Sequence, residues 1–268
     1  MPATFLLSLR RLTAAALPLA AALVVSAGCN LHIGTGIEAR ESWTKSYTVK
    51  PGATLAVRES NGKIHVSAAD GDKIEVTATK ISKGSTEEAA KADLKEFSIA
   101  ETATAELVEF DSSNRSLQMT LHGSRRVEYE IKVPKGVNVT LKTANAAIDV
   151  QGVTGQLTIE TTNGDIEASG LGGGADVTAV NGRVRLEFTK VHDAGVRCKT
   201  TNGQIIVTLP VAAKATIAAR VLHGDIQTEN LSLKMNEESR QRLDATLGGG
   251  GPEIRLETTN GEVRVVGK

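Results

Sequence analysis

Residues that commonly bind metals or act as nucleophiles are few in this sequence and lie far apart. The 268 residues include 2 Cys and 5 His. A zinc site needs several Cys or His ligands at short, regular spacing. The histidines have no such neighbours; they are His32, His65, His122, His192 and His223. We therefore expect no metal site and no cofactor.

Two aspartates give the strongest hint of catalysis. Asp165 and Asp225 follow a turn at the same point of a repeated segment, and glycosidases cleave polysaccharides with a pair of carboxylates. The same point in other repeats holds Arg183, Gln204 and Glu262, and such a mixture of polar types is typical of a solvent-exposed face. The sequence therefore predicts no catalytic residue, and a carbohydrate-active enzyme ranks third among the interpretations.

Cys198 occupies a repeat position that is otherwise filled by aliphatic residues. The equivalent residues are Leu141, Ile159, Val177, Ala219 and Leu256. Because a buried free cysteine behaves as a small hydrophobic residue, we expect Cys198 to lie in the core and to be unreactive.

Aromatic and basic residues in the N-terminal part of the chain are candidates for contact with a ligand. Trp43 and Tyr47 lie in the first predicted strand, and Arg125 and Arg126 lie close in sequence to Tyr129. The simpler expectation is that the aromatic residues pack a first strand and that the two arginines are solvated. The sequence alone does not identify ligand-binding residues.

The first 28 residues have the parts of an export signal. Arg10 and Arg11 precede an apolar run over residues 12–25, and Ala27-Gly28-Cys29 follows. The run is shorter than the ~20 residues that a transmembrane helix needs. An ordinary signal peptide, with Cys29 incidental, is one interpretation of this segment.

The segment Ala27-Gly28-Cys29 also resembles the lipobox of bacterial lipoproteins. This resemblance implies that Cys29 becomes the mature N-terminus and carries acyl chains, palmitate among them, which attach the protein to a membrane. The chain then divides into a lipoprotein signal peptide (1–28), a lipidated tether (29–42) and a folded domain (43–268). Asn30 is not the Asp that favours inner-membrane retention, so outer-membrane anchoring is expected if the host is Gram-negative.

The mature chain is close to neutral. Lys+Arg and Asp+Glu both number 31, and loss of Arg10 and Arg11 with the signal peptide leaves a net charge of −2. Nucleic-acid-binding proteins usually carry a basic excess, so no nucleic-acid partner is expected.

A motif based on Asn-Gly recurs through most of the chain. It is centred on Asn145, Asn163, Asn181, Asn202, His223 and Asn260, with steps of 18, 18, 21, 21 and 37 residues. Apolar and polar residues alternate on both sides of each motif, as they do in half-buried β-strands. Asn and Gly tolerate the positive φ that a tight corner requires.

Self-similarity at this spacing indicates stacked repeats, each unable to bury its apolar face alone. We predict an all-β fold, a β-helix-like solenoid of about 18–21-residue rungs with one short N-terminal helix. Asn-Gly is also a strong hairpin signal, so a twisted antiparallel β-sandwich is the alternative.

The N-terminal part looks like a diverged version of the same repeat. Residues 55–66 fit the register, with Glu59 breaking the apolar pattern, and residues 108–119 fit more loosely. Residues 229–251 form an irregular insertion that is expected to lie over a flank.

One short helix is predicted over residues 85–97. Ser85 and Glu88 form a capping-box pattern, and Ala89, Ala92 and Phe97 fall roughly on one side. We expect this helix to cover an open end of the stack, since repeat folds must protect their edges.

The opening segment YTVKPGATLAVRESNGKIHVSAADGDKIEVTATK, followed by repeats similar to TTNGDIEA, resembles a bacterial candidate-adhesin family of domains of unknown function. The likeness covers about residues 43–268. It implies a β-helix-like domain of cell-envelope proteins and transfers no catalytic residue. Ala146 in place of Gly and His223 in place of Asn depart from the repeat.

The leading interpretation is a non-enzymatic, lipid-anchored cell-envelope protein that acts as an adhesin or surface-binding module. Its partner would be an envelope polysaccharide or another protein, still unidentified. The alternative is a periplasmic scaffold or a signalling accessory protein.

Overall fold

The computed structural model describes residues 24–26, 37–113 and 124–268. Cys29 and most of the predicted signal peptide lie outside these ranges. The described chain forms one helix, α1 (Glu87–Glu96), and twenty strands. The strands are β1 (Val24–Ser26), β2 (Ile37–Thr48), β3 (Thr54–Ala69), β4 (Lys73–Gly84), β5 (Ala100–Ala103), β6 (Leu107–Asp111), β7 (Arg125–Pro134), β8 (Asn138–Gln151), β9 (Leu157–Asn163), β10 (Ile166–Leu171), β11 (Ala175–Asn181), β12 (Val184–Phe188), β13 (Val196–Asn202), β14 (Ile205–Leu209), β15 (Ala215–His223), β16 (Ile226–Glu229), β17 (Leu233–Glu238), β18 (Arg242–Leu247), β19 (Glu253–Asn260) and β20 (Val263–Gly267).

Each repeat contributes one strand before its Asn-Gly corner and one strand after it, so the strands form two ladders. The first ladder has the order β5-β6-β3-β8-β9-β11-β13-β19-β15-β18-β17. The second ladder has the order β1-β2-β4-β7-β3-β8-β10-β12-β14-β20-β16. Strands β3 and β8 continue through the corner and belong to both ladders.

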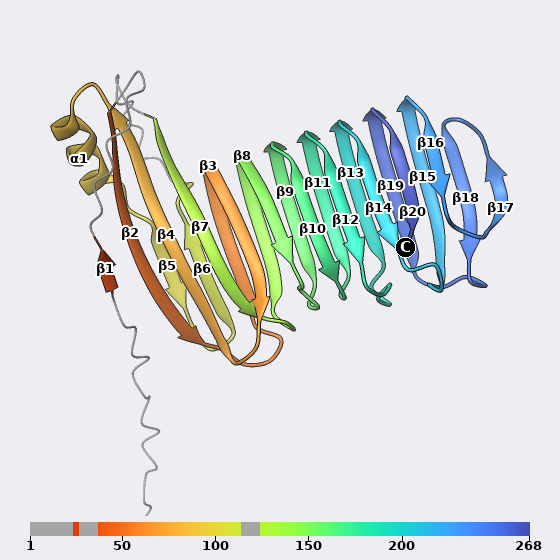
Figure 1. Ribbon diagram of the computed structural model, residues 1–268, viewed down its shortest axis with the longest axis horizontal. Coiled ribbons are helices and arrows are strands. Elements are labelled where there is room, and N and C mark those ends of the chain that lie inside the picture. Colours follow the sequence, from red (N-terminus) through yellow and green to blue (C-terminus); the bar gives the residue numbers. More distant parts are fainter. Residues whose placement is uncertain (1–23, 27–36, 114–123) are drawn as a thin grey trace, which may run out of the picture.

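The predicted all-β solenoid is confirmed. All central neighbours pair in parallel, and Figure 1 shows these rungs side by side in a row. The alternative sandwich would have required antiparallel pairs throughout. Among the described strands such pairs occur only at the two ends of the row. One end has β1, β2, β4 and β7, with β5 and β6, and the other has β15, β18 and β17.

The predicted register is also confirmed in the central rungs. Val177 pairs with Ile159 on one side and with Cys198 on the other, and all three are fully buried. The inward side chains of both ladders belong to one hydrophobic cluster. This cluster is the core that stacking completes.

The corner requires glycine for two reasons, which Gly182 illustrates. Its φ is +142°, a backbone conformation that other residues rarely adopt. A Cβ atom there would lie 2.2 Å from the carbonyl oxygen of Gly164 in the neighbouring rung. Close stacking of the corners therefore excludes a side chain at this point.

Asparagine side chains form a continuous hydrogen-bonded ladder along these corners. From Asn145 to Asn260, each Nδ2 donates to the Oδ1 of the asparagine that precedes it in the ladder, at 2.7–2.9 Å. The ladder runs in the spatial order Asn61, Asn145, Asn163, Asn181, Asn202 and Asn260.

The rungs do not stack in sequence order at the C-terminal end. The last rung, β19 and β20, lies between the rung of β13 and β14 and the rung of β15 and β16. This insertion places Asn260 beside Asn202 and moves His223 to the end of the row. The asparagine ladder is thereby uninterrupted, which gives the order a physical reason.

A similar insertion occurs at the N-terminal end. Strand β3 lies between the β6 and β7 rung and strand β8. Val108 and Phe110 have the predicted register against Leu55 and Val57. The second strand of that rung is β7, rather than the predicted stretch up to residue 119, whose residues from 114 onward lie outside the described ranges.

Helix α1 packs on β2 and β4 at the N-terminal end of the stack (Figure 1). Its N-cap is Thr86, whose hydroxyl accepts a hydrogen bond from the Ala89 backbone N–H, so the predicted cap at Ser85 was off by one residue. The buried face is Ala90 and Leu94, rather than Ala89 and Ala92. Both buried residues pack with Ala39 of β2.

The insertion over residues 229–251 does not lie over a flank as expected. It forms β17 and β18, which extend the first ladder by antiparallel pairing with β15. Leu243, Ala245 and Leu247 of β18 are buried in the common core. The alternation of these apolar residues with polar ones is the sequence pattern that predicts a strand in this segment.

Candidate functional site

The two candidate catalytic aspartates do not come together. Asp165 precedes β10 and Asp225 precedes β16, and three strands of the second ladder separate them. At ~4.8 Å per strand, four steps correspond to about 19 Å, well beyond the ~5–9.5 Å between the carboxylates of a glycosidase. Asp165 accepts a hydrogen bond from the Arg183 backbone N–H at 2.8 Å, and Asp225 forms an ion pair with Arg240 at 3.0 Å.

Cys198 lies in the core, as predicted. Its side chain is fully buried between Val177 of β11 and Leu256 of β19. Burial raises the pKa of the Cys198 thiol well above its ordinary value, and the Asp176 carboxylate adds to the shift. A buried, protonated thiol is a poor nucleophile.

Trp43 and Tyr47 pack strand β2 against the core, in agreement with the simpler expectation. Both rings contact Phe110, with centroid distances of 5.6 Å and 5.9 Å. The Tyr47 hydroxyl donates to Glu101 Oε1 at 2.7 Å. Burial, followed by this contact with Glu101, raises the pKa of Tyr47.

The expectation that Arg125 and Arg126 are solvated was wrong. Arg125 Nε donates to Asp93 of α1 at 2.8 Å, and Arg126 forms an ion pair with Glu38 of β2 at 3.2 Å. The hydrogen bond from Arg125 holds the pKa of Asp93 below its usual range, although burial opposes the shift. These arginines thus hold the helix and the first strand in place.

Glu59, which interrupts the apolar pattern of its repeat, is buried inside a polar cluster. The Ser112 hydroxyl donates to its carboxylate, and the Tyr129 hydroxyl donates to Ser112 Oγ at 3.1 Å. A buried charge is costly unless it is hydrogen-bonded. The two hydroxyls explain how the core accommodates this residue.

The outer face of the first ladder carries a row of charged residues in register. From Lys142 the row crosses one strand at a time through Glu160, Thr178, Lys199, Glu257, Arg220 and Arg242. Lys142 and Glu160 pair at 2.9 Å, and Arg242 pairs with Glu237 at 3.2 Å. Within the described part of the chain, neither Lys199 nor Arg220 has an ion-pair partner within 4 Å.

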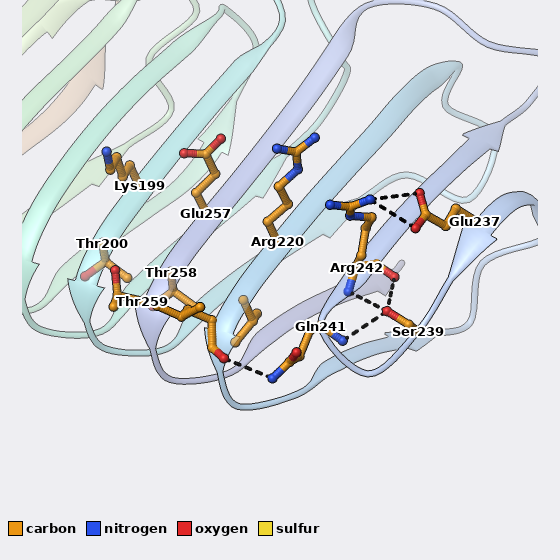
Figure 2. Close-up of a pocket in the computed structure, with 12 residues that line it drawn as sticks. Lys199, Thr200, Arg220, Glu237, Ser239, Gln241, Arg242, Glu257, Thr258 and Thr259 are labelled. Atoms are coloured by element: carbon orange, nitrogen blue, oxygen red, sulfur yellow. Dashed lines mark hydrogen bonds and ion pairs between the residues drawn. The ribbon is translucent and has the colours of Figure 1, made fainter.

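An open groove with a volume of about 580 Å³ lies at the C-terminal end of this row. We call it the C-terminal groove. Its lining includes Lys199, Thr200, Arg220, Gln241, Arg242 and Glu257, from β13, β15, β19 and the turn before β18. Figure 2 shows Lys199, Glu257 and Arg220 next to one another, with Arg242 and Glu237 beyond them.

Hydrogen bonds fix the turn that forms one wall of the groove. Gln241 Nε2 donates to the Leu222 carbonyl at 2.9 Å, and the Val221 N–H donates to the Gln241 carbonyl at 3.0 Å (Figure 2 shows the former). Ser239 Oγ accepts from the backbone N–H groups of Gln241 and Arg242. The wall is therefore tied to β15 and is not a free loop.

Thr200 is among the lining residues, but its side chain lies on the buried face of β13. The residue is 1% exposed, and its Oγ1 has no hydrogen-bond partner among the described residues. Thr258 lies beside it in the neighbouring strand, and its hydroxyl donates to the Gly203 carbonyl at 3.2 Å.

Sequence reasoning did not find this groove. Its residues come from four segments that are adjacent only because β19 inserts beside β13 and the 229–251 insertion extends the ladder. The alternating pattern did identify Lys199, Arg220 and Glu257 as outward-facing. What it lacked was the spatial order of the rungs.

The described residues contain no group of three His, Cys, Asp or Glu side chains arranged to hold a metal ion. They also contain no helix of the length and hydropathy needed to cross a membrane.

Several solved structures resemble this chain at low identity. One is a candidate cell adhesion protein from Clostridium sporogenes ATCC 15579, with a TM-score of 0.41 and 15% identity, covering 84% of this chain and 99% of that one. Another is a candidate adhesin from Bacteroides fragilis NCTC 9343, with a TM-score of 0.40 and 12% identity, covering 84% and 96%. A candidate lipid binding protein from Parabacteroides distasonis ATCC 8503 has a TM-score of 0.28 and 10% identity, covering 84% and 96%.

No curated protein matches the sequence at a significant level. The family described as Toastrack DUF4097 matches residues 50–266, which include both ladders from β3 to β20 and the whole asparagine ladder. This span is most of the chain and agrees with the repeat pattern and the stacked fold. The chain therefore belongs to the Toastrack DUF4097 family.

Proposed function

We propose that this protein is a non-enzymatic, lipid-anchored protein of the cell envelope that binds a surface partner. Acyl chains on Cys29 hold it in a membrane, the outer membrane in a Gram-negative host. The stack of rungs then presents its polar faces, and the C-terminal groove in particular, to an envelope polysaccharide or another protein.

The observation that carries this proposal is the position of the groove relative to the start of the folded domain. Strand β2, which follows the predicted tether, lies at one end of the row of rungs (Figure 1). The groove lies at the other end, between β13 and β18. Continuous pairing between these ends makes a rigid spacer, and repeat proteins use such extended surfaces for binding.

The wide separation of Asp165 and Asp225 favours binding over polysaccharide cleavage by this pair. Each carboxylate also has a partner of its own, Arg183 N–H and the Arg240 guanidinium. Two carboxylates that do not face a common substrate bond cannot share the acid and nucleophile roles.

The lipid anchor is tested by replacing each of the two cysteines in turn, with Cys198 as the control for Cys29. We expect radiolabelled palmitate to be incorporated into the wild type and into Cys198→Ala, and both proteins to fractionate with membranes. Cys29→Ala should take up no label and leave the membrane fraction. Equal labelling of Cys29→Ala and the wild type would contradict the lipid anchor.

A further inference from the structure

We infer that the C-terminal groove binds an acidic polysaccharide, one whose sugars carry carboxylate groups. This inference rests on the proposed function as a surface-binding module and adds the chemical class of the ligand. Two features of the groove carry it: cations without ion-pair partners in the described chain, and a set of groups suited to hydroxyls.

The cations are Lys199 and Arg220, on either side of Glu257. Strand β19 separates their strands, so their backbones are about 9.5 Å apart. Neither has an ion-pair partner within 4 Å among the described residues, whereas Arg242 is paired with Glu237. An arginine binds a carboxylate through two parallel hydrogen bonds, so Arg220 suits the carboxylate of one sugar and Lys199 that of another along the same chain.

The groups between and beside these cations suit the hydroxyls of a sugar ring. The Glu257 carboxylate accepts hydrogen bonds, and it lies between the two cations in Figure 2. The hydroxyl of Thr259, at the edge of the groove, both donates and accepts. A ligand that carried only negative charge would be repelled by Glu257, whereas a carboxylated sugar offers hydroxyl donors at that point.

A nucleic acid is a poorer match for the same cations. None of the residues that line the groove is aromatic, and single-stranded nucleic acids are held by bases stacked on aromatic side chains. A ligand that binds these cations through phosphate groups alone is the remaining alternative, and the test below includes it.

The test measures binding by the full-length protein in detergent, by calorimetry, with oligogalacturonate as the carboxylated probe. A neutral galactan oligosaccharide of equal length and inorganic polyphosphate are the comparison ligands. We expect oligogalacturonate to bind at least tenfold more tightly than either. Arg220→Ala and Lys199→Ala should each weaken binding about tenfold, because each removes a charge-assisted contact.

Two further variants are controls. Lys142→Ala lies in the same row but is paired with Glu160, so it should leave binding unchanged. Thr200→Val removes a hydroxyl that is buried beneath the groove and has no hydrogen-bond partner among the described residues, so it should leave both binding and the thermal midpoint unchanged.

The proposal is overturned if polyphosphate or the neutral oligosaccharide binds as well as oligogalacturonate. It is also overturned if Arg220→Ala and Lys199→Ala both bind like the wild type. Sedimentation of the same protein with envelope fragments tests the surface-binding function separately. Retained sedimentation without a preference for the carboxylated probe removes this inference alone, whereas loss of both removes the proposed function as well.

Discussion

Asn260 Nδ2 donates a hydrogen bond to Asn202 Oδ1 at 2.7 Å, although 58 residues separate the two in the sequence. The contact exists because the C-terminal rung inserts between the rungs of β13 and β15. The same insertion brings Glu257 between Lys199 and Arg220. The order of the rungs thus determines both the continuity of the asparagine ladder and the composition of the groove.

The asparagine ladder should contribute measurably to stability. Asn181→Ala removes two side-chain hydrogen bonds, to Asn163 and from Asn202. At ~1 kcal/mol for each bond, we expect the free energy of unfolding in urea to fall by about 2 kcal/mol. Asn236→Ala removes a carboxamide outside the ladder and should change it by less than about 0.5 kcal/mol. Equal effects of the two variants would mean that the ladder adds no stability.

The buried register can be tested with a charge placed on inward-facing and outward-facing residues of the rungs. Val177→Asp buries a carboxylate in the core, and an unpaired buried charge costs several kcal/mol. We expect this variant to unfold cooperatively at a much lower urea concentration, or not to fold. Leu256→Asp should behave alike, while Thr178→Asp on the exposed face should resemble the wild type. Wild-type midpoints for both core variants would refute the register.

Part of this fold follows from the sequence and part does not. Period-two alternation predicted that Val177 and Cys198 point inward, because only one face of each strand is buried. It carried no information on which rung inserts where, since the alternating pattern is much the same in every rung. Ser85 and Thr86 are equally good helix caps by type, and the packing of Ala90 and Leu94 on Ala39 fixed the choice.

The candidate site was less accessible to sequence reasoning than the fold. Lys199, Arg220 and Glu257 were correctly placed on an outer face. Their proximity depends on pairings over long sequence distances, and the wall at Gln241 depends on an insertion that shows no Asn-Gly repeat.

The thiol of Cys198 should be protected by the fold. In the native protein we expect reaction with a thiol-specific disulfide reagent to be slower by several orders of magnitude than in urea, because reaction requires global opening. Burial raises the pKa of Cys198 above its ordinary value of 9.0, so the unfolded chain loses this proton first as the pH rises. Stability should therefore decline above about pH 9, and less so in Cys198→Ala. Rapid labelling of the native thiol would show that the core is open at this point.

The contact between Asp93 and Arg125 should fasten helix α1 to the stack. The Arg125 hydrogen bond lowers the pKa of Asp93, against the effect of burial, so its stabilising contribution is present at neutral pH and is lost as the pH falls below about 4. Arg125→Ala should leave the partly buried Asp93 without its main partner. We expect faster amide hydrogen exchange in α1 of this variant, with the central rungs unchanged. Lys95→Ala on the exposed side is the control; exchange equally fast in both would contradict the role of the ion pair.

Protease treatment of intact cells that express the full precursor tests the central claim most directly, with lysed cells and Cys29→Ala as controls. A lipid-anchored module that binds a surface partner should be digested on intact cells, with residues from the C-terminal groove among the released peptides. Protection of the wild-type protein until the cells are lysed would contradict surface exposure, and it would favour a scaffold or signalling accessory in the periplasm.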